Sequence, residues 1–207
     1  MKRIFALLAA LVLTIGAFGQ SPKAIIAKME SVLEKHEKEG IVMTVDVKVP
    51  IVGTMTTKSW ILGDKMRMEA TLAGVKVITW TDGKTEWTYN TKTNKVEIKK
   101  MEGGSSSDSG GDTELFIGIT DGYDVSLSKE TDKVWYFTCT KMKTNKDKDD
   151  PKKIELAVAK GNYYPVKLST KMSGITMTMR GISFGVSEKQ VTFNKSDYPT
   201  ATIEDKR

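Results

Sequence analysis

The chain is poor in the side chains on which most enzymes depend. Its 207 residues include one Cys and one His. A Ser-His-Asp or Cys-His arrangement would have to use His36, which lies in a run of charged residues on the polar side of a predicted helix. A histidine in such a run is more often solvated than catalytic. The sequence therefore favours a protein that is not an enzyme and that has no cofactor.

Ligands for a metal ion are equally scarce. The carboxylates of Asp147, Asp149 and Asp150 stand in a Lys-rich loop without the glycine and distal glutamate of a calcium loop. Cys139 falls inside a predicted strand and has no second Cys to pair with, so we interpret it as a small buried apolar group. We predict no metal site. Converging carboxylates of a secreted hydrolase stay open as an alternative that nothing in the sequence favours.

Nucleic-acid binding is also disfavoured. The formal net charge of +6 comes from 32 basic and 26 acidic residues that are interspersed along the chain. No Arg-rich stripe with interleaved aromatic residues is present. The composition of the Gly-Ser-rich stretch 102–112 predicts a flexible loop. A phosphate-binding loop is disfavoured there, because the stretch lacks the Gly-Lys-Ser/Thr ending of that motif. The composition is that of one globular domain.

The first 19 residues have the features of an export signal. Lys2 and Arg3 precede an apolar stretch from Ile4 to Ile15, and Ala17-Phe18-Gly19 forms a small-x-small cleavage site. We predict a signal peptide at 1–19 that is cleaved after Gly19, and a single domain at 20–207. No Cys lies near the cleavage site, so the expectation is an exported protein without a lipid anchor.

An amphipathic helix is predicted to begin after this signal. Ser21 is placed to cap it, Pro22 suits its first turn, and Gly40 is expected to end it. The apolar stripe along one face comprises Ile25, Ile26, Met29, Val32 and Leu33. The helix either packs on a sheet or plugs an open barrel in which Met29 and Leu33 touch a ligand. The pattern fits both arrangements.

Most of the remaining chain alternates with the period of two that is typical of strands. Met43, Val45 and Val47 alternate with polar residues, and Met66 and Met68 do the same in a later segment. A third segment contains Val77, and after the hairpin turn Asp82-Gly83, Trp87 and Tyr89 share one face. These segments predict an antiparallel meander with one apolar and one polar face. About ten to twelve strands and no βαβ rhythm argue for a barrel or a curved sheet.

Two short motifs in this meander resemble a known family. Residues 82–90 read DGKTEWTYN, and residues 63–69 read GDKMRME. Together with the order of the predicted elements, they resemble the central hairpins of the periplasmic outer-membrane lipoprotein carriers (LolA-like). The resemblance covers nearly all of the chain after the signal peptide. One departure stands out: the Arg-Pro pair expected after the second strand is replaced by Gly63-Asp64.

The resemblance implies a fold and a function. The fold is mainly β with one long N-terminal helix, an open antiparallel half-barrel with helices covering the concave face. The function is that of a soluble periplasmic carrier that holds acyl chains of lipoproteins in a hydrophobic cavity and delivers them to the outer membrane. Membrane-bound donor and acceptor proteins would be its partners, and the carrier would act as a monomer. An envelope protein-interaction or sensing module with the same fold, or a binder of other lipids, is the alternative.

Residues for such a cavity follow from the resemblance and from an excess of methionine, of which there are 11. Flexible thioether side chains suit variable apolar partners, although they also occur in ordinary cores. In the resembled family a segment after the middle loop helps to cover the cavity, and here it could equally fill the core. The predicted cavity and lid residues are Met29, Leu33, Met43, Val45, Val47, Met66, Met68, Val77, Trp87, Tyr89, Leu115, Phe116, Ile119, Met177 and Met179.

Overall fold

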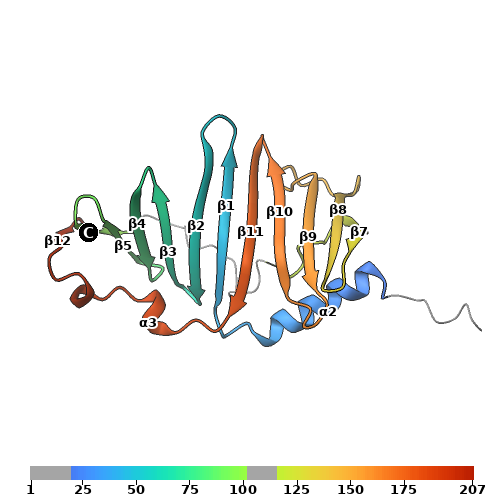
Figure 1. Cartoon of the computed structure of the whole chain (residues 1–207), viewed down its shortest axis with the longest axis horizontal. Helices are drawn as coiled ribbons and strands as arrows, with labels where there is room; N and C mark the ends of the chain where they lie inside the picture. Colours follow the sequence, from blue (N-terminus) through green and yellow to red (C-terminus); the bar gives the residue numbers. More distant parts are fainter. Residues whose placement is uncertain (1–19, 102–115) are drawn as a thin grey trace, which may run out of the picture.

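A computed structural model describes residues 20–101 and 116–207 (Figure 1). The predicted signal peptide, the whole Gly-Ser-rich loop 102–112 and Leu115 lie outside these ranges. The helical elements are α2 (Pro22–Lys35), α3 (Glu188–Val191) and a 3-10 turn η1 (Lys195–Asp197). The strands are β1 (Ile41–Val49), β2 (Gly53–Leu62), β3 (Lys65–Leu72), β4 (Val75–Thr81), β5 (Thr85–Asn90), β6 (Lys95–Lys100), β7 (Tyr123–Glu130), β8 (Val134–Lys141), β9 (Lys153–Ala159), β10 (Pro165–Met172), β11 (Ile175–Phe184) and β12 (Thr202–Asp205).

All described strands belong to one open sheet. Their order is β12-β6-β5-β4-β3-β2-β1-β11-β10-β9-β8-β7, so β12 and β7 are its two edges. Every pair is antiparallel except β12 with β6, which run parallel. The central pair, β1 with β11, joins the first meander to the last one. The prediction of a mainly β protein with an unclosed antiparallel sheet is confirmed.

Helix α2 covers one side of the sheet, which we call the helix side. Its buried residues Ile25, Ile26, Met29 and Leu33 pack in one cluster with side chains of β1 and β7 to β10. In Figure 1 the helix runs beside the ends of these strands. Burial of four such side chains contributes on the order of 2 kcal/mol each. The predicted apolar stripe therefore becomes the contact between helix and sheet.

The ends of α2 follow from local chemistry. The Ser21 hydroxyl accepts a hydrogen bond from the Ala24 N–H at 3.3 Å, which confirms the predicted cap. The helix ends at Lys35, five residues before Gly40, so the predicted end is too late. Gly40 instead lies at the entry into β1. Its φ is +69°, and a Cβ there would lie 2.6 Å from the Ile61 carbonyl oxygen, so only glycine lets the chain enter β1 this closely.

The other half of the sheet buries its apolar side chains on the opposite, outer side. Antiparallel partners directly across a ladder project to the same side. Val42 pairs with Trp60, Trp60 with Arg67, and Arg67 with Trp80, and all alternate with helix-side residues. The C-terminal segment from Val186 to Tyr198 packs against this outer side. The sheet thus has two covers, one on each side.

Candidate functional site

The partly exposed methionines of the strands gather on the helix side. Met55 and Met177 pair with Val47 from its two sides, and Met179 pairs with Val45. Met68 pairs with Ser59, which in turn pairs with Met43. The same alternation places Met66 and Met172 on this side. We call this surface the methionine face and define it as Met55, Met66, Met68, Met172, Met177 and Met179.

Several side chains of the methionine face are open to solvent. Met55 is 43% exposed, Met172 is 42% exposed and Met177 is 38% exposed, while the other three are half-buried. The half-buried residues Val45, Val47 and Val77 lie among them on the same side. This surface borders the cluster under α2, since Val45 and Met179 pack against that cluster. It is formed by side chains that adapt easily to another apolar shape.

Four predicted cavity and lid residues lie in the closed core instead. Met29 and Leu33 of α2, Met43 of β1 and Phe116 have at most 3% of their surface exposed. They belong to one cluster with Phe137, Leu156 and Val158, and half-buried Ile119 packs against it. The Gly118 N–H donates a hydrogen bond to the Glu30 carboxylate of α2 at 3.1 Å, which holds this segment to the helix. Beneath α2 the interior is filled by the protein's own side chains.

The expectation that the meander has a single apolar face is wrong. Trp87 pairs with Trp80 and Tyr89 pairs with Ile78, and these pairs project to the outer side, away from Met66, Met68 and Val77. Period-two alternation separates two faces in each strand, but it does not say which face of one strand continues into the next. Both faces of this half are partly apolar, so the sequence pattern was compatible with either assignment.

Trp87 and Tyr89 are part of an outer aromatic cluster with Trp80, Phe193 and Tyr198. Phe193 stacks on Trp87 with ring centroids 5.9 Å apart, and Tyr198 lies 4.5 Å from Tyr89. Phe193 and Tyr198 stack on each other at 5.8 Å. Burial raises the pKa of the Tyr198 hydroxyl. The cluster fastens the C-terminal segment to the sheet.

Arg67 fills the space between two of the outer tryptophans. Its guanidinium lies 5.1 Å from the Trp60 ring and 5.5 Å from the Trp80 ring, and it forms an ion pair with Glu69. Lys76 also contacts Glu69 at 2.8 Å. These cations lower the pKa of the Glu69 carboxyl against the opposing effect of its burial. The predicted polar side of β3 is thus an ordered cation–aromatic layer.

His36, the only histidine of the sequence, lies at the edge of the core. The expectation that it is freely solvated is wrong. His36 stacks on Phe184 with ring centroids 4.7 Å apart, and its Nε2 lies 2.7 Å from the Tyr164 hydroxyl. Its Nδ1 lies 3.0 Å from a Glu39 oxygen. These contacts join the end of α2 to β11 and to the turn before β10. They explain the position of the residue structurally.

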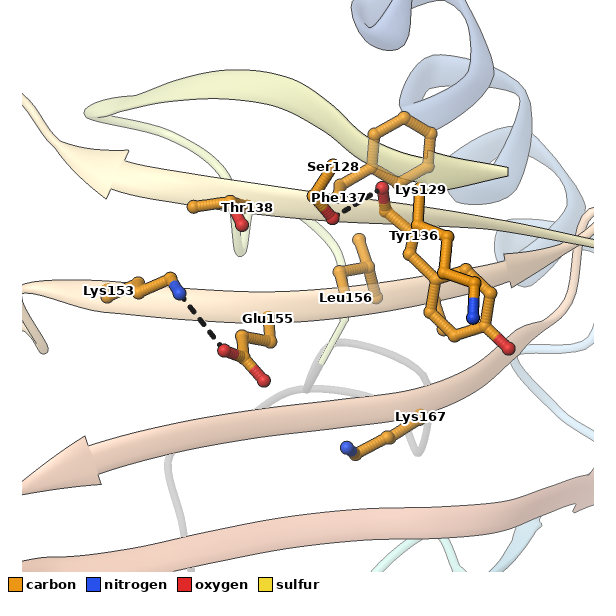
Figure 2. A pocket seen from close by; sticks show the side chains of 10 residues that line it. Ser128, Lys129, Tyr136, Phe137, Thr138, Lys153, Glu155, Leu156 and Lys167 are labelled. Carbon is orange, nitrogen blue, oxygen red and sulfur yellow. Dashed lines mark hydrogen bonds and ion pairs between the residues drawn. The ribbon is translucent and has the colours of Figure 1, made fainter. Parts of the chain in front are cut away.

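A hollow of about 310 Å³ lies on the outer side of β7 to β10 (Figure 2). Ser128, Tyr136, Thr138 and Glu155 line it, and Lys153 pairs with Glu155 at 3.0 Å. The Ser128 hydroxyl donates to the Tyr136 carbonyl oxygen at 3.0 Å. Glu155, the acidic side chain that lines this hollow, is thus already paired with Lys153, so the arrangement offers no free carboxylate for catalysis.

Within residues 20–101 and 116–207, no three His, Cys, Asp or Glu side chains come together to hold a metal ion. No helix in these ranges is long and apolar enough to cross a membrane.

The chain is similar to known proteins in fold and not in sequence. No protein-family model matches the chain, and no curated protein matches it. LprF from Mycobacterium bovis is 11% identical with a TM-score of 0.50, over 81% of this chain and 95% of LprF. A LolA superfamily protein from Nitrosomonas europaea is 12% identical with a TM-score of 0.30, over 81% and 98%.

A third neighbour is MucB from the MucA/MucB complex of Pseudomonas aeruginosa. It is 14% identical with a TM-score of 0.44, and the similarity covers 82% of this chain and 61% of that chain. The likeness to LprF shows a shared fold. A LolA superfamily protein is also among the structural neighbours of the chain.

Proposed function

We propose that the chain is an exported carrier that is not an enzyme and that binds acyl chains of lipoproteins on the methionine face. In this proposal residues 1–19 are removed on export, and residues 20–207 act in the periplasm as a monomer between a membrane-bound donor and an acceptor at the outer membrane. The observation that carries the proposal is the gathering of six partly exposed methionines on one side of an open sheet.

The energetics suit a carrier that must release its cargo. Burial of one methylene contributes about 0.8 kcal/mol, so a 16-carbon chain buried completely would gain on the order of 12 kcal/mol. A surface that buries about half of such a chain gains about 6 kcal/mol, which corresponds to micromolar-to-millimolar binding. Unbranched thioether side chains can follow a disordered acyl chain without a fixed shape. A partly open methionine face therefore favours exchange over permanent storage.

The proposed contacts divide the predicted cavity residues into three groups. Val45, Val47, Val77 and the methionine face would touch the acyl chains. The fixed core beside these contacts would consist of Met29 and Leu33 of α2 together with Met43, Phe116 and Ile119. Trp87 and Tyr89 are assigned no contact, because they lie on the outer side under Phe193 and Tyr198.

Two matched double variants test the carrier proposal. Met55→Gln with Met177→Gln makes the positions on both sides of Val47 polar. Thr54→Gln with Thr176→Gln changes the next positions of the same strands, on both sides of Lys48 and on the outer side. After delipidation, we expect the parent and the threonine variant each to form a soluble one-to-one complex with a triacylated lipoprotein. The methionine variant should bind this lipoprotein at least about tenfold more weakly.

The readout is the lipoprotein that stays in solution after detergent removal, measured by size-exclusion chromatography and by mass spectrometry of the bound lipid. A parent protein that leaves all of the lipoprotein aggregated would remove the carrier role. Equal loss in both double variants would place the cargo elsewhere.

The second candidate is a protein-interaction module that uses the same face. The buried cluster beneath α2 favours it, since each of its buried side chains has at most 5% of its surface exposed. In this case the methionine face would receive an apolar segment of an envelope protein. The two candidates separate in the same experiment, because a module of this kind would purify without lipid and would keep no lipoprotein in solution.

A further inference from the structure

Two neighbouring hairpin turns project together from one end of the sheet. The first joins β1 to β2 through Pro50, Ile51 and Val52, and the second joins β10 to β11 through Ser173 and Gly174. Figure 1 shows both at the same end of the sheet. The central pairing of β1 with β11 brings them into contact, since a Cβ on Gly174 would lie 3.7 Å from the Pro50 side chain. We call residues 50–52 and 172–175 the hairpin tip.

The hairpin tip exposes apolar side chains without any cover among the described residues. Ile51 is 107% exposed relative to its reference surface and Val52 is 83% exposed. Met172 at 42% and Ile175 at 40% stand beside them on the neighbouring turn. Branched aliphatic side chains at the apex of a turn stabilise nothing in the folded chain, and turns normally carry Gly, Asn, Asp or Ser instead.

The backbone of the first turn is strained as well. Ile51 has φ +70°, a region that is unusual for any residue with a side chain and rare for a β-branched one. The Val52 N–H donates to the Pro50 carbonyl oxygen at 2.8 Å, which closes a three-residue turn around Ile51. Asn or Gly would occupy this position with less strain. An isoleucine that costs stability both by exposure and by strain indicates a function of its side chain.

Positive charge lies beside this apolar apex. Lys48 and Lys171 both pair with Thr176, one from each side, and both are exposed on the outer side of the sheet. Neither lysine has an ion pair with any described residue, and the sequence contains no Asp or Glu in residues 47–63 or 156–187. Asp46, two residues before Lys48, is already engaged by Arg180 at 2.6 Å. This end of the molecule therefore combines exposed apolar side chains with two lysines that form no ion pair with any described residue.

We propose that the hairpin tip docks on the surface of a bilayer that contains anionic phospholipids. Ile51 and Val52 enter the boundary between headgroups and acyl chains, while Lys48 and Lys171 contact the phosphates. A bilayer accepts a small convex apolar crest without shape complementarity, and the lysines supply the preference for negative headgroups. Met172 belongs to both the hairpin tip and the methionine face, but the residues proposed to touch the bilayer, Ile51, Val52, Lys48 and Lys171, are not among the cargo contacts proposed above.

The test measures co-sedimentation of the processed chain with vesicles of phosphatidylcholine alone and of phosphatidylcholine mixed with phosphatidylglycerol. Lys48→Gln and Lys171→Gln are each expected to lower binding to the mixed vesicles about fivefold, which corresponds to about 1 kcal/mol per lysine. Lys133→Gln, in the turn between β7 and β8 at the opposite end of the sheet, is the matched control and should bind as the parent does.

The apolar contribution is tested with the double variant Ile51→Asn and Val52→Asn. We expect at least about tenfold weaker binding to mixed vesicles, an unchanged or higher melting temperature because Asn tolerates positive φ, and unchanged binding of the lipoprotein cargo. All variants carry the same N-terminus, so differences report on the hairpin tip alone.

Three results would overturn the proposal. The first is equal binding of the parent to neutral and mixed vesicles. The second is parent-like binding by the double Asn variant. In the third, the double variant leaves sedimentation with vesicles unchanged but alters the oligomeric state in light scattering, which would make the tip a contact between copies of the chain.

Discussion

Cys139 lies in the middle of β8 with none of its surface exposed. Burial raises the pKa of its thiol from the usual 9.0 to about 11. At pH 8 only about a thousandth of such a thiol is ionised, and the thiolate is the reactive form. The sequence-based interpretation of a buried apolar group is confirmed.

We predict that Cys139 does not react with Ellman's reagent at pH 8 until the protein unfolds. In denaturant, one thiol per chain should react at once. Because the folded-state pKa is raised, the contribution of this residue to stability is complete below pH 9 and is lost as the pH rises toward about 11. Rapid labelling of the native protein, with Cys139→Ala as the blank, would contradict this prediction.

At the scale of single elements, the entry into β1 depends on one glycine. Gly40 and Gly74 both have positive φ, +69° and +79°. A Cβ on Gly40 would lie 2.6 Å from a backbone oxygen and 2.7 Å from the Val186 Cβ, whereas Gly74 faces open space. The two positions share the strain of the left-handed region and differ only in the clash.

We therefore expect Gly40→Ala to destabilise the protein by about 3 kcal/mol or more and Gly74→Ala by about 1 kcal/mol. The measurement is the midpoint and slope of urea unfolding for both variants beside the parent. Equal midpoints for the two variants would show that β1 and Val186 can separate at little cost, contrary to the close approach described above.

The elements show how far sequence reasoning reaches. The cap at Ser21, the stripe of α2 and the alternation of Met66 and Met68 follow from local rules, and each appears as expected. The side on which Trp87 and Tyr89 lie does not follow, since it depends on contacts with Phe193 and Tyr198 more than a hundred residues later. The strained apex at Ile51 also escapes prediction, because no local rule places isoleucine at positive φ.

At the scale of the whole molecule, the sheet needs a cover on each side. Helix α2 closes one side over β7 to β11 and β1, and the C-terminal segment closes the other side over β2 to β6. The outer aromatic cluster forms part of this second contact. Phe193 sits at its centre, 5.4 Å from Trp80 and 5.9 Å from Trp87.

We predict that Phe193→Ala destabilises the protein by about 2–3 kcal/mol and shifts tryptophan emission to longer wavelength, because Trp80 and Trp87 become hydrated. Lys195→Ala, in the same segment but exposed, is the control and should change neither property. Stability is read from urea unfolding, and hydration from the emission maximum and acrylamide quenching. An unshifted spectrum for Phe193→Ala would mean that the C-terminal segment does not shield the tryptophans.

The pairing of β1 with β11 sets an order of events in biosynthesis. Asp46 and Arg180, which join these strands, are 134 residues apart, and the residues that shelter Trp80 and Trp87 come later still. A nascent polypeptide therefore cannot complete its sheet until almost all of it has been made. For the export proposed above, this order keeps the sheet incomplete until the last residues have been made, which would suit threading through a narrow secretion channel.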